Sequence, residues 1–132
     1  MAKFNWYTTY SVNHEIIDNH HRHIIDLFNR IYDNLGDVDS KLYDETVDEL
    51  IAYAGYHFDA EKKLMEEIDY ADIECHLKEH QQFSDKVLEL KTRKGQLSEA
   101  QYNELVCHLG FWVLNHETEK DMPLAKALNQ NR

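Results

Sequence analysis

Apolar residues recur at alternating steps of three and four along most of the chain, and this period restricts the fold more than any other feature. It runs through residues 17–35, 43–68, 73–90 and 102–116. Such a step places these residues on one face of an α-helix. The 132 residues include only 4 glycines and 1 proline, too few for the many tight turns of an all-β fold. The sequence therefore predicts an all-α protein with four long amphipathic helices.

Turn and capping signals separate the four segments. Gly36 is a candidate for the end of the first helix, and Gly95 for the end of the third. Ser98, followed three residues later by Gln101, is a capping box that begins the fourth helix, which Pro123 is expected to end or kink. Short connections between four long helices favour an antiparallel up-down-up-down four-helix bundle.

An aromatic arm precedes the first helix. It carries Phe4, Trp6, Tyr7 and Tyr10, too many aromatic side chains for a solvated tail, so we expect it to pack across one end of the bundle. A chain of 132 residues is long enough for one hydrophobic core, and we expect residues 1–132 to form a single domain.

The composition restricts the classes of binding partner and the compartment that we expect. The net charge is −11, with 14 Lys and Arg against 25 Asp and Glu, which makes nucleic acid and anionic membranes poor partners. No apolar run approaches the roughly 20 residues of a membrane span, and no signal peptide is evident, so we expect a cytoplasmic protein. Cys75 and Cys107 form no CxxC pair, which favours free thiols in a reducing compartment. No further apolar face is evident, which favours a monomer.

Six polar side chains occupy positions that the period assigns to the core. They are His21, His57, Glu61, His76, His80 and His116. Burying one imidazole or carboxylate without a partner costs on the order of 1 to 3 kcal/mol. Six such sites would remove much of a typical stability of about 5 to 15 kcal/mol, so one common partner must offset the cost of burying all six. A bound metal does so.

Local spacing agrees with a metal site. His57 and Glu61 are four residues apart, as are His76 and His80, so each pair lies on one helix face, about 5 to 6 Å apart, and can converge on one ion. The alternative is a hydrogen-bonded network without metal, but five imidazoles around one carboxylate leave too few acceptors. Four other histidines fall off this face and are expected to point to solvent: His14, His20, His23 and His108.

The order of these residues, H…HxxxE…HxxxH…HxxxxD, ends at Asp121 and resembles that of the hemerythrin family, in particular its single-domain bacteriohemerythrins. The matching stretches span nearly the whole chain. They are Trp6 with residues 10–12, and residues 17–21, 53–65, 76–83 and 112–121. The resemblance implies a four-helix bundle that holds two non-haem iron ions and binds dioxygen.

The resemblance also implies a role for each ligand. One iron would be held by His76, His80 and His116, and the other by His21 and His57. Glu61, Asp121 and an oxo or hydroxo group would bridge them. These ligands would leave one position open on the iron with two histidines, which is where the family binds dioxygen.

Asp121 is assigned by the resemblance alone. Five residues after His116 correspond to about 140° around an ideal α-helix, and the period favours Glu119 instead. Pro123 indicates a distorted helix end that could turn the Asp121 carboxylate inward.

The oxygen pocket is implied by the same resemblance. Ile24, Phe58, Trp112 and Val113 match the family's pocket positions, and an apolar wall would protect bound oxygen from water and protons. Glu117 stands where the family usually carries Ile, and an inward carboxylate would promote autoxidation or peroxide chemistry. Leu124 replaces a family tyrosine, Val113 a leucine and Asn13 a glycine.

The function so implied is reversible dioxygen binding for storage, transport or scavenging, without enzymatic turnover. A diiron reductase of peroxide or nitric oxide is one alternative, with Glu117 as its only support. An oxygen or redox sensor module is another, and a zinc-binding or metal-storage protein is a third, because His and carboxylate ligands alone do not exclude zinc.

Overall fold

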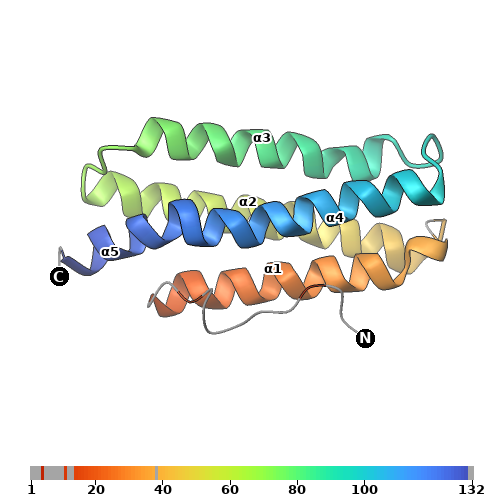
Figure 1. Ribbon diagram of the computed structural model, residues 1–132, viewed down its shortest axis with the longest axis horizontal. Coiled ribbons are helices and arrows are strands. Elements are labelled where there is room, and N and C mark those ends of the chain that lie inside the picture. Colours follow the sequence, from red (N-terminus) through yellow and green to blue (C-terminus); the bar gives the residue numbers. More distant parts are fainter. Residues whose placement is uncertain (1–3, 5–10, 12–13, 38, 131–132) are drawn as a thin grey trace.

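Four long helices lie side by side and form an antiparallel bundle (Figure 1). The computed structural model describes residues 4, 11, 14–37 and 39–130. The long helices are α1 (Glu15–Asp33), α2 (Lys41–Glu67), α3 (Ile73–Thr92) and α4 (Glu99–His116). Contacts run from α1 to α2, α2 to α3, α3 to α4, and from α4 back to α1, so the bundle is closed. The predicted all-α, up-down-up-down fold is confirmed.

Helix ends follow the local chemistry of the sequence. The Ser40 hydroxyl accepts a hydrogen bond of 3.0 Å from the Tyr43 N–H at the start of α2. The capping box before α4 is present, because Gln101 N–H donates to Ser98 Oγ at 3.2 Å and Ser98 N–H donates to Gln101 Oε1 at 2.8 Å. Gly36 does not end α1. The helix stops at Asp33, with Asn34 as its C-cap, and a short 3₁₀ helix, η2 (Leu35–Asp37), follows.

The fourth helix does not end at Pro123. After α4 the chain makes a π-helical turn, η3 (Glu117–Asp121), and continues as α5 (Met122–Gln130). Pro123 lies in the first turn of α5, directly after the π-helical turn, and has no N–H to donate to a carbonyl of the preceding turn.

The interior is layered along the bundle axis. A large apolar cluster fills the half that contains the α1–α2 and α3–α4 connections, with fully buried side chains such as Phe28, Leu50 and Leu90. A small apolar cluster of Ile17 and Ala125 lies toward the other end. The buried polar residues of the candidate site lie between the two, so apolar packing holds the site from both sides.

Phe4 is the aromatic residue of the arm that the structure describes, and it packs against the side of the bundle rather than across its end. Its ring lies edge-on to Phe28 of α1 at 6.1 Å and to Phe111 of α4 at 5.3 Å. The Asn29 side chain binds the Phe4 backbone N–H and C=O, each at 2.7 Å. Gly110 permits this approach, because a Cβ there would lie 2.5 Å from the Phe4 ring. Trp6, Tyr7, Tyr10 and Asn13 lie outside the described residues.

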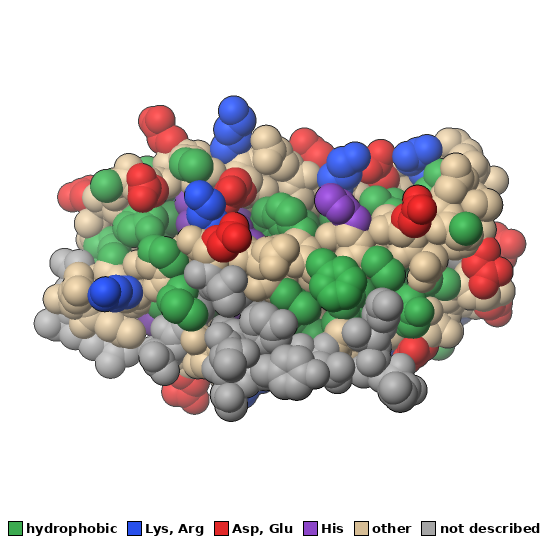
Figure 2. All heavy atoms as spheres, in the orientation of Figure 1, with side chains coloured by type: hydrophobic (Ala, Val, Ile, Leu, Met, Phe, Trp, Pro, Cys, Tyr) green, Lys and Arg blue, Asp and Glu red, His purple; other side chains and the backbone are tan. Residues whose placement is uncertain are grey.

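Among the described side chains on the face that Figure 2 shows, acidic and basic groups are interspersed. Within the described residues, no helix is both long and apolar enough to cross a membrane.

Candidate metal centre

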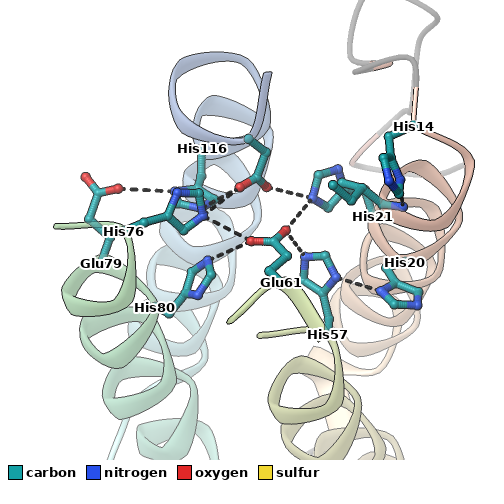
Figure 3. Close-up of polar contacts among 11 residues, drawn as sticks. His14, His20, His21, His57, Glu61, His76, Glu79, His80 and His116 are labelled. Carbon is teal, nitrogen blue, oxygen red and sulfur yellow. Dashed lines mark hydrogen bonds and ion pairs between the residues drawn. The ribbon is translucent and has the colours of Figure 1, made fainter. Parts of the chain in front are cut away.

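Seven side chains from five helical elements converge on one point inside the bundle (Figure 3). Each is at most 7% exposed. They are His21 from α1, His57 and Glu61 from α2, His76 and His80 from α3, His116 from α4 and Asp121 from η3. The structure thus brings together all seven residues singled out from the sequence.

Asp121 reaches this point because of the π turn. In a π-helix the backbone hydrogen bonds join residues five apart, so residues at this spacing lie nearly one above the other. His116 and Asp121 span one such turn, and His116 Nε2 lies 3.1 Å from Asp121 Oδ1. Glu119, which the α-helical period favoured, is exposed.

Each carboxylate divides its two oxygens between two groups of histidines. Glu61 Oε1 lies 2.7 Å from His57 Nε2, and Glu61 Oε2 lies 3.0 Å from His76 Nε2 and 3.1 Å from His80 Nε2. Asp121 Oδ2 lies 2.8 Å from His21 Nε2, and its Oδ1 lies 3.0 Å from His76 Nε2. Both carboxylates therefore face both groups.

The same division appears when ligand atoms are grouped by distance. One group holds three histidines, the other holds two, and the atoms within each lie within 4.8 Å of one another. Glu61 and Asp121 belong to both groups. This geometry would suit two adjacent cation sites that share two carboxylates.

Without a cation, protons balance the two buried carboxylates. Burial and the neighbouring Asp121 oppose ionisation of Glu61, but His57 and His76 outweigh them and hold the Glu61 pKa well below its usual range. Burial likewise opposes ionisation of Asp121, yet His116, His21 and His76 lower its pKa. The same contacts raise the pKa values of two of these imidazoles.

The basic imidazoles are those of His57 and His76. Burial lowers their pKa values, but this effect is outweighed: Glu61 raises that of His57, and hydrogen bonds to Asp121 and Glu61 raise that of His76 to about 9. Burial dominates at His80, whose pKa is lowered. Imidazoles of increased basicity thus face two carboxylates, an arrangement in which metal ions could replace protons.

The polar atoms left over fit bound cations. Within the described part of the chain, His80 Nε2, His116 Nε2 and both oxygens of Asp121 are buried and have no hydrogen-bond partner other than the contacts of 2.8 to 3.1 Å within the cluster itself. Buried polar atoms are normally satisfied, so several at one point indicate a missing ligand. Imidazole nitrogens and carboxylate oxygens suit iron. The donor set therefore fits the diiron centre that the sequence implied.

A small cavity adjoins the cluster. About 10 Å³ is open to the centre of a water-sized molecule, which is room for about one such molecule. Its apolar wall contains the predicted Ile24, Phe58, Trp112 and Val113, together with Phe83. Phe83 lies on the predicted core face of α3 and could have been included on that ground. The side chain of Glu117 lies outside the described part of the structure, and Leu124 is buried.

The expectation that four histidines point to solvent is wrong for His20. This residue is only 9% exposed, and its Nδ1 lies 2.8 Å from His57 Nδ1. Burial, together with the nearby His57 and His21, lowers the His20 pKa to about 4. The signal was present, because residue 20 lies three after Ile17 and four before Ile24, inside a wider apolar stripe. His108 is exposed, His23 is partly exposed, and His14 accepts a hydrogen bond from the Ile17 N–H.

Glu79 is a second neighbour of the cluster that sequence reasoning missed. Its Oε2 lies 3.4 Å from His116 Nδ1, on the side of the ring away from the centre, and its Oε1 lies 3.9 Å from Lys120 Nζ. Glu79 lies one turn before Phe83 on α3, and the sequence does not show which α4 residue it faces.

Known proteins share this architecture. The family model described as Hemerythrin HHE cation binding domain matches residues 12–128. The bacteriohemerythrin of Stenotrophomonas maltophilia (strain R551-3) is 30% identical over 125 residues, which cover 95% of this chain and 81% of the relative. The myohemerythrin of Theromyzon tessulatum is 32% identical over 113 residues, covering 86% and 83%. A crystal structure of wild-type hemerythrin has the same fold, with a TM-score of 0.83 at 23% identity over 96% of this chain and 98% of that chain. Because the family model covers most of the sequence, the chain belongs to the hemerythrin family.

Proposed function

We propose that this protein binds dioxygen reversibly at a diiron centre. Membership of the hemerythrin family supports a non-haem iron, oxygen-binding domain rather than an enzyme. The observation that carries the proposal is the division of each carboxylate, with one oxygen toward each group of histidines. Glu61 and Asp121 would bridge the two irons together with an oxo or hydroxo group.

The histidines would divide between the two ions as the distances divide them. His76, His80 and His116 would hold one iron, and His21 and His57 the other. The second group offers one protein ligand fewer, and the cavity adjoins the cluster. A pair of ferrous ions supplies, when bound, the two electrons that dioxygen accepts on binding and returns on release.

The cavity wall supports binding rather than turnover. Ile24, Phe58, Phe83 and Val113 are apolar, and among the described wall residues only the proposed ligands carry an acid or a base. An apolar wall keeps water and protons away from bound oxygen, and both promote its loss in a reduced form. These side chains therefore favour release of dioxygen unchanged.

The test is a cycle of reduction and aeration on the purified protein. We expect two irons per chain and a visible absorption band that disappears on anaerobic reduction and returns with oxygen. Asp121→Asn should lose iron, whereas Glu119→Gln, a change at an exposed residue two positions away, should keep both ions. Two irons whose spectrum goes directly to the oxidised form, with no oxygen-dependent band, would contradict reversible binding.

A further inference from the structure

His20 lies directly behind one of the proposed ligands. Its ring and that of His57 meet edge-on, with centroids 5.0 Å apart and the two Nδ1 atoms 2.8 Å apart (Figure 3). The other ring nitrogen of His57, Nε2, points to the centre and lies 2.7 Å from Glu61 Oε1. His57 therefore uses one nitrogen toward the centre and the other toward His20.

This contact admits only one arrangement of protons. A hydrogen bond between two ring nitrogens needs one donor and one acceptor. Since His57 Nε2 must offer a lone pair to a cation, its proton resides on Nδ1. His20 Nδ1 must then be the acceptor, and His20 carries its own proton on Nε2. A cationic His20 would turn a second N–H toward the first and break the contact.

We propose that His20 is a positioning residue for the metal centre: it accepts the His57 Nδ1–H and so fixes the tautomer and ring orientation in which His57 Nε2 binds iron. This inference rests on the proposed diiron centre. It goes beyond it by assigning a role to a histidine outside the ligand set.

His20 is itself held in place. Tyr53 lies edge-on to the His20 ring at 5.7 Å, and Tyr56 contacts it at 5.3 Å. Tyr53 precedes His57 by one turn of α2 and Tyr56 is the residue directly before it, so the helix that carries the proposed ligand also forms the pocket for its acceptor. A ring packed in this way loses little freedom when it accepts the hydrogen bond.

The hydrogen-bond acceptor behind His57 is the neutral ring of His20, whereas the group behind His116 is charged. Behind His116, in the group of three histidines, the neighbour is the Glu79 carboxylate at 3.4 Å. A carboxylate acceptor makes an imidazole a stronger electron donor than a neutral acceptor does. We therefore expect His20→Glu to lower the reduction potential of the centre, and His20→Gln, a neutral acceptor, to leave it close to that of the unmodified protein.

The decisive experiment combines metal titration with NMR. Metal-free protein is titrated with Zn²⁺, a diamagnetic probe, and long-range ¹H–¹⁵N spectra report the histidine tautomers. We expect the His20 proton on Nε2 both with and without zinc. His20→Leu should weaken binding of one of the two ions by about 10- to 100-fold, and His20→Gln should restore it. His23→Leu is the matched control, because His23 also contacts Tyr53 but has a surface carboxylate, Glu49, as its partner.

The outcomes separate this role from the proposed function. Two zinc ions bound equally well by His20→Leu and His23→Leu, or a His20 proton on Nδ1, would overturn the role of His20 alone. An unmodified protein that binds fewer than two ions would overturn the diiron centre, and the role of His20 with it. Circular dichroism of each variant checks its fold, and the tautomer measurement needs no variant.

Discussion

Removing the metal should reverse the way stability depends on pH. In the metal-free protein, Glu61 and Asp121 keep their charge because protonated imidazoles face them, and His76 has a pKa of about 9 instead of 6.5. A group whose pKa is raised by folding stabilises the fold fully below its unfolded value and loses that contribution as the pH rises through the folded value. The metal-free protein should therefore lose stability between pH 6.5 and about 9.

The size of this loss follows from the shift at His76. One pKa unit corresponds to 1.36 kcal/mol, so a rise from 6.5 to about 9 represents about 3 kcal/mol of unfolding free energy. For a chain of this length, that change lowers the midpoint of thermal unfolding by about 10 °C. His57, whose pKa is also raised, changes in the same direction. The carboxylates act oppositely, because their lowered pKa values remove stability only as the pH falls through the acid range.

The metal-loaded protein should behave in the opposite way. A ligand nitrogen must be unprotonated to bind an ion, so protons on the imidazoles of the cluster, above all on His76, compete with the ions and are released on binding. Affinity, and with it the stabilisation by bound metal, should rise over the pH interval in which the metal-free protein weakens.

Thermal unfolding followed by circular dichroism at 222 nm, from pH 6 to 9.5 with and without metal, measures both trends. In the metal-free protein, His76→Gln should remove most of the decline, and His108→Gln, at an exposed position, should leave it unchanged. Metal-free stability that stays level or increases between pH 6.5 and 9 would refute the reasoning.

Three further changes test other parts of the structure. Gly110→Ala should destabilise the fold by about 1 to 3 kcal/mol in urea unfolding, because its Cβ would lie 2.5 Å from the Phe4 ring, and should become neutral or stabilising in a Phe4→Ala background. Trp112→Ala should speed loss of the oxygen-dependent band at least severalfold, because Trp112 lines both the small cavity and a surface groove of about 580 Å³ between α3 and α4. Phe111→Ala, at an exposed neighbour, should not. Deleting Thr118 should leave two ions bound, because Asp121 would then follow His116 by four residues in a regular α-helix. Inserting an alanine after Thr118 should instead lower the metal content measured per chain by one ion.

The bundle and most of the site could be predicted from the sequence because both obey a single repeat. Each of the six proposed ligands on regular helices lies where the three-and-four step places the interior, and burial of all six agrees. A pattern of this kind reports which face of a helix is covered. It does not report what covers it.

The acceptors behind the ligands were missed for that reason. His20 lies at the edge of the α1 stripe, and only the approach of α2 turns that edge into an interior position beside His57. Glu79 is 30% exposed and has no apolar pattern to mark it, yet it lies against His116. Both contacts depend on the rotation of one helix against another, which the period of a single helix does not contain.

Asp121 was missed by the period for a different reason, which lies within one helix. A 3.6-residue period treats every turn as equal, so one extra residue in η3 displaces each later position by about 100°. That extra residue lies beside Pro123, which has no N–H to donate to the carbonyl four residues earlier, so the α-helical ladder is already incomplete where the wide turn occurs. A π turn at this point therefore breaks few regular backbone hydrogen bonds, and it places the Asp121 carboxylate opposite Glu61. The 3.6-residue period therefore fails at Asp121. A regular helix at this position would have turned Asp121 away and left the proposed centre with Glu61 as its single shared carboxylate.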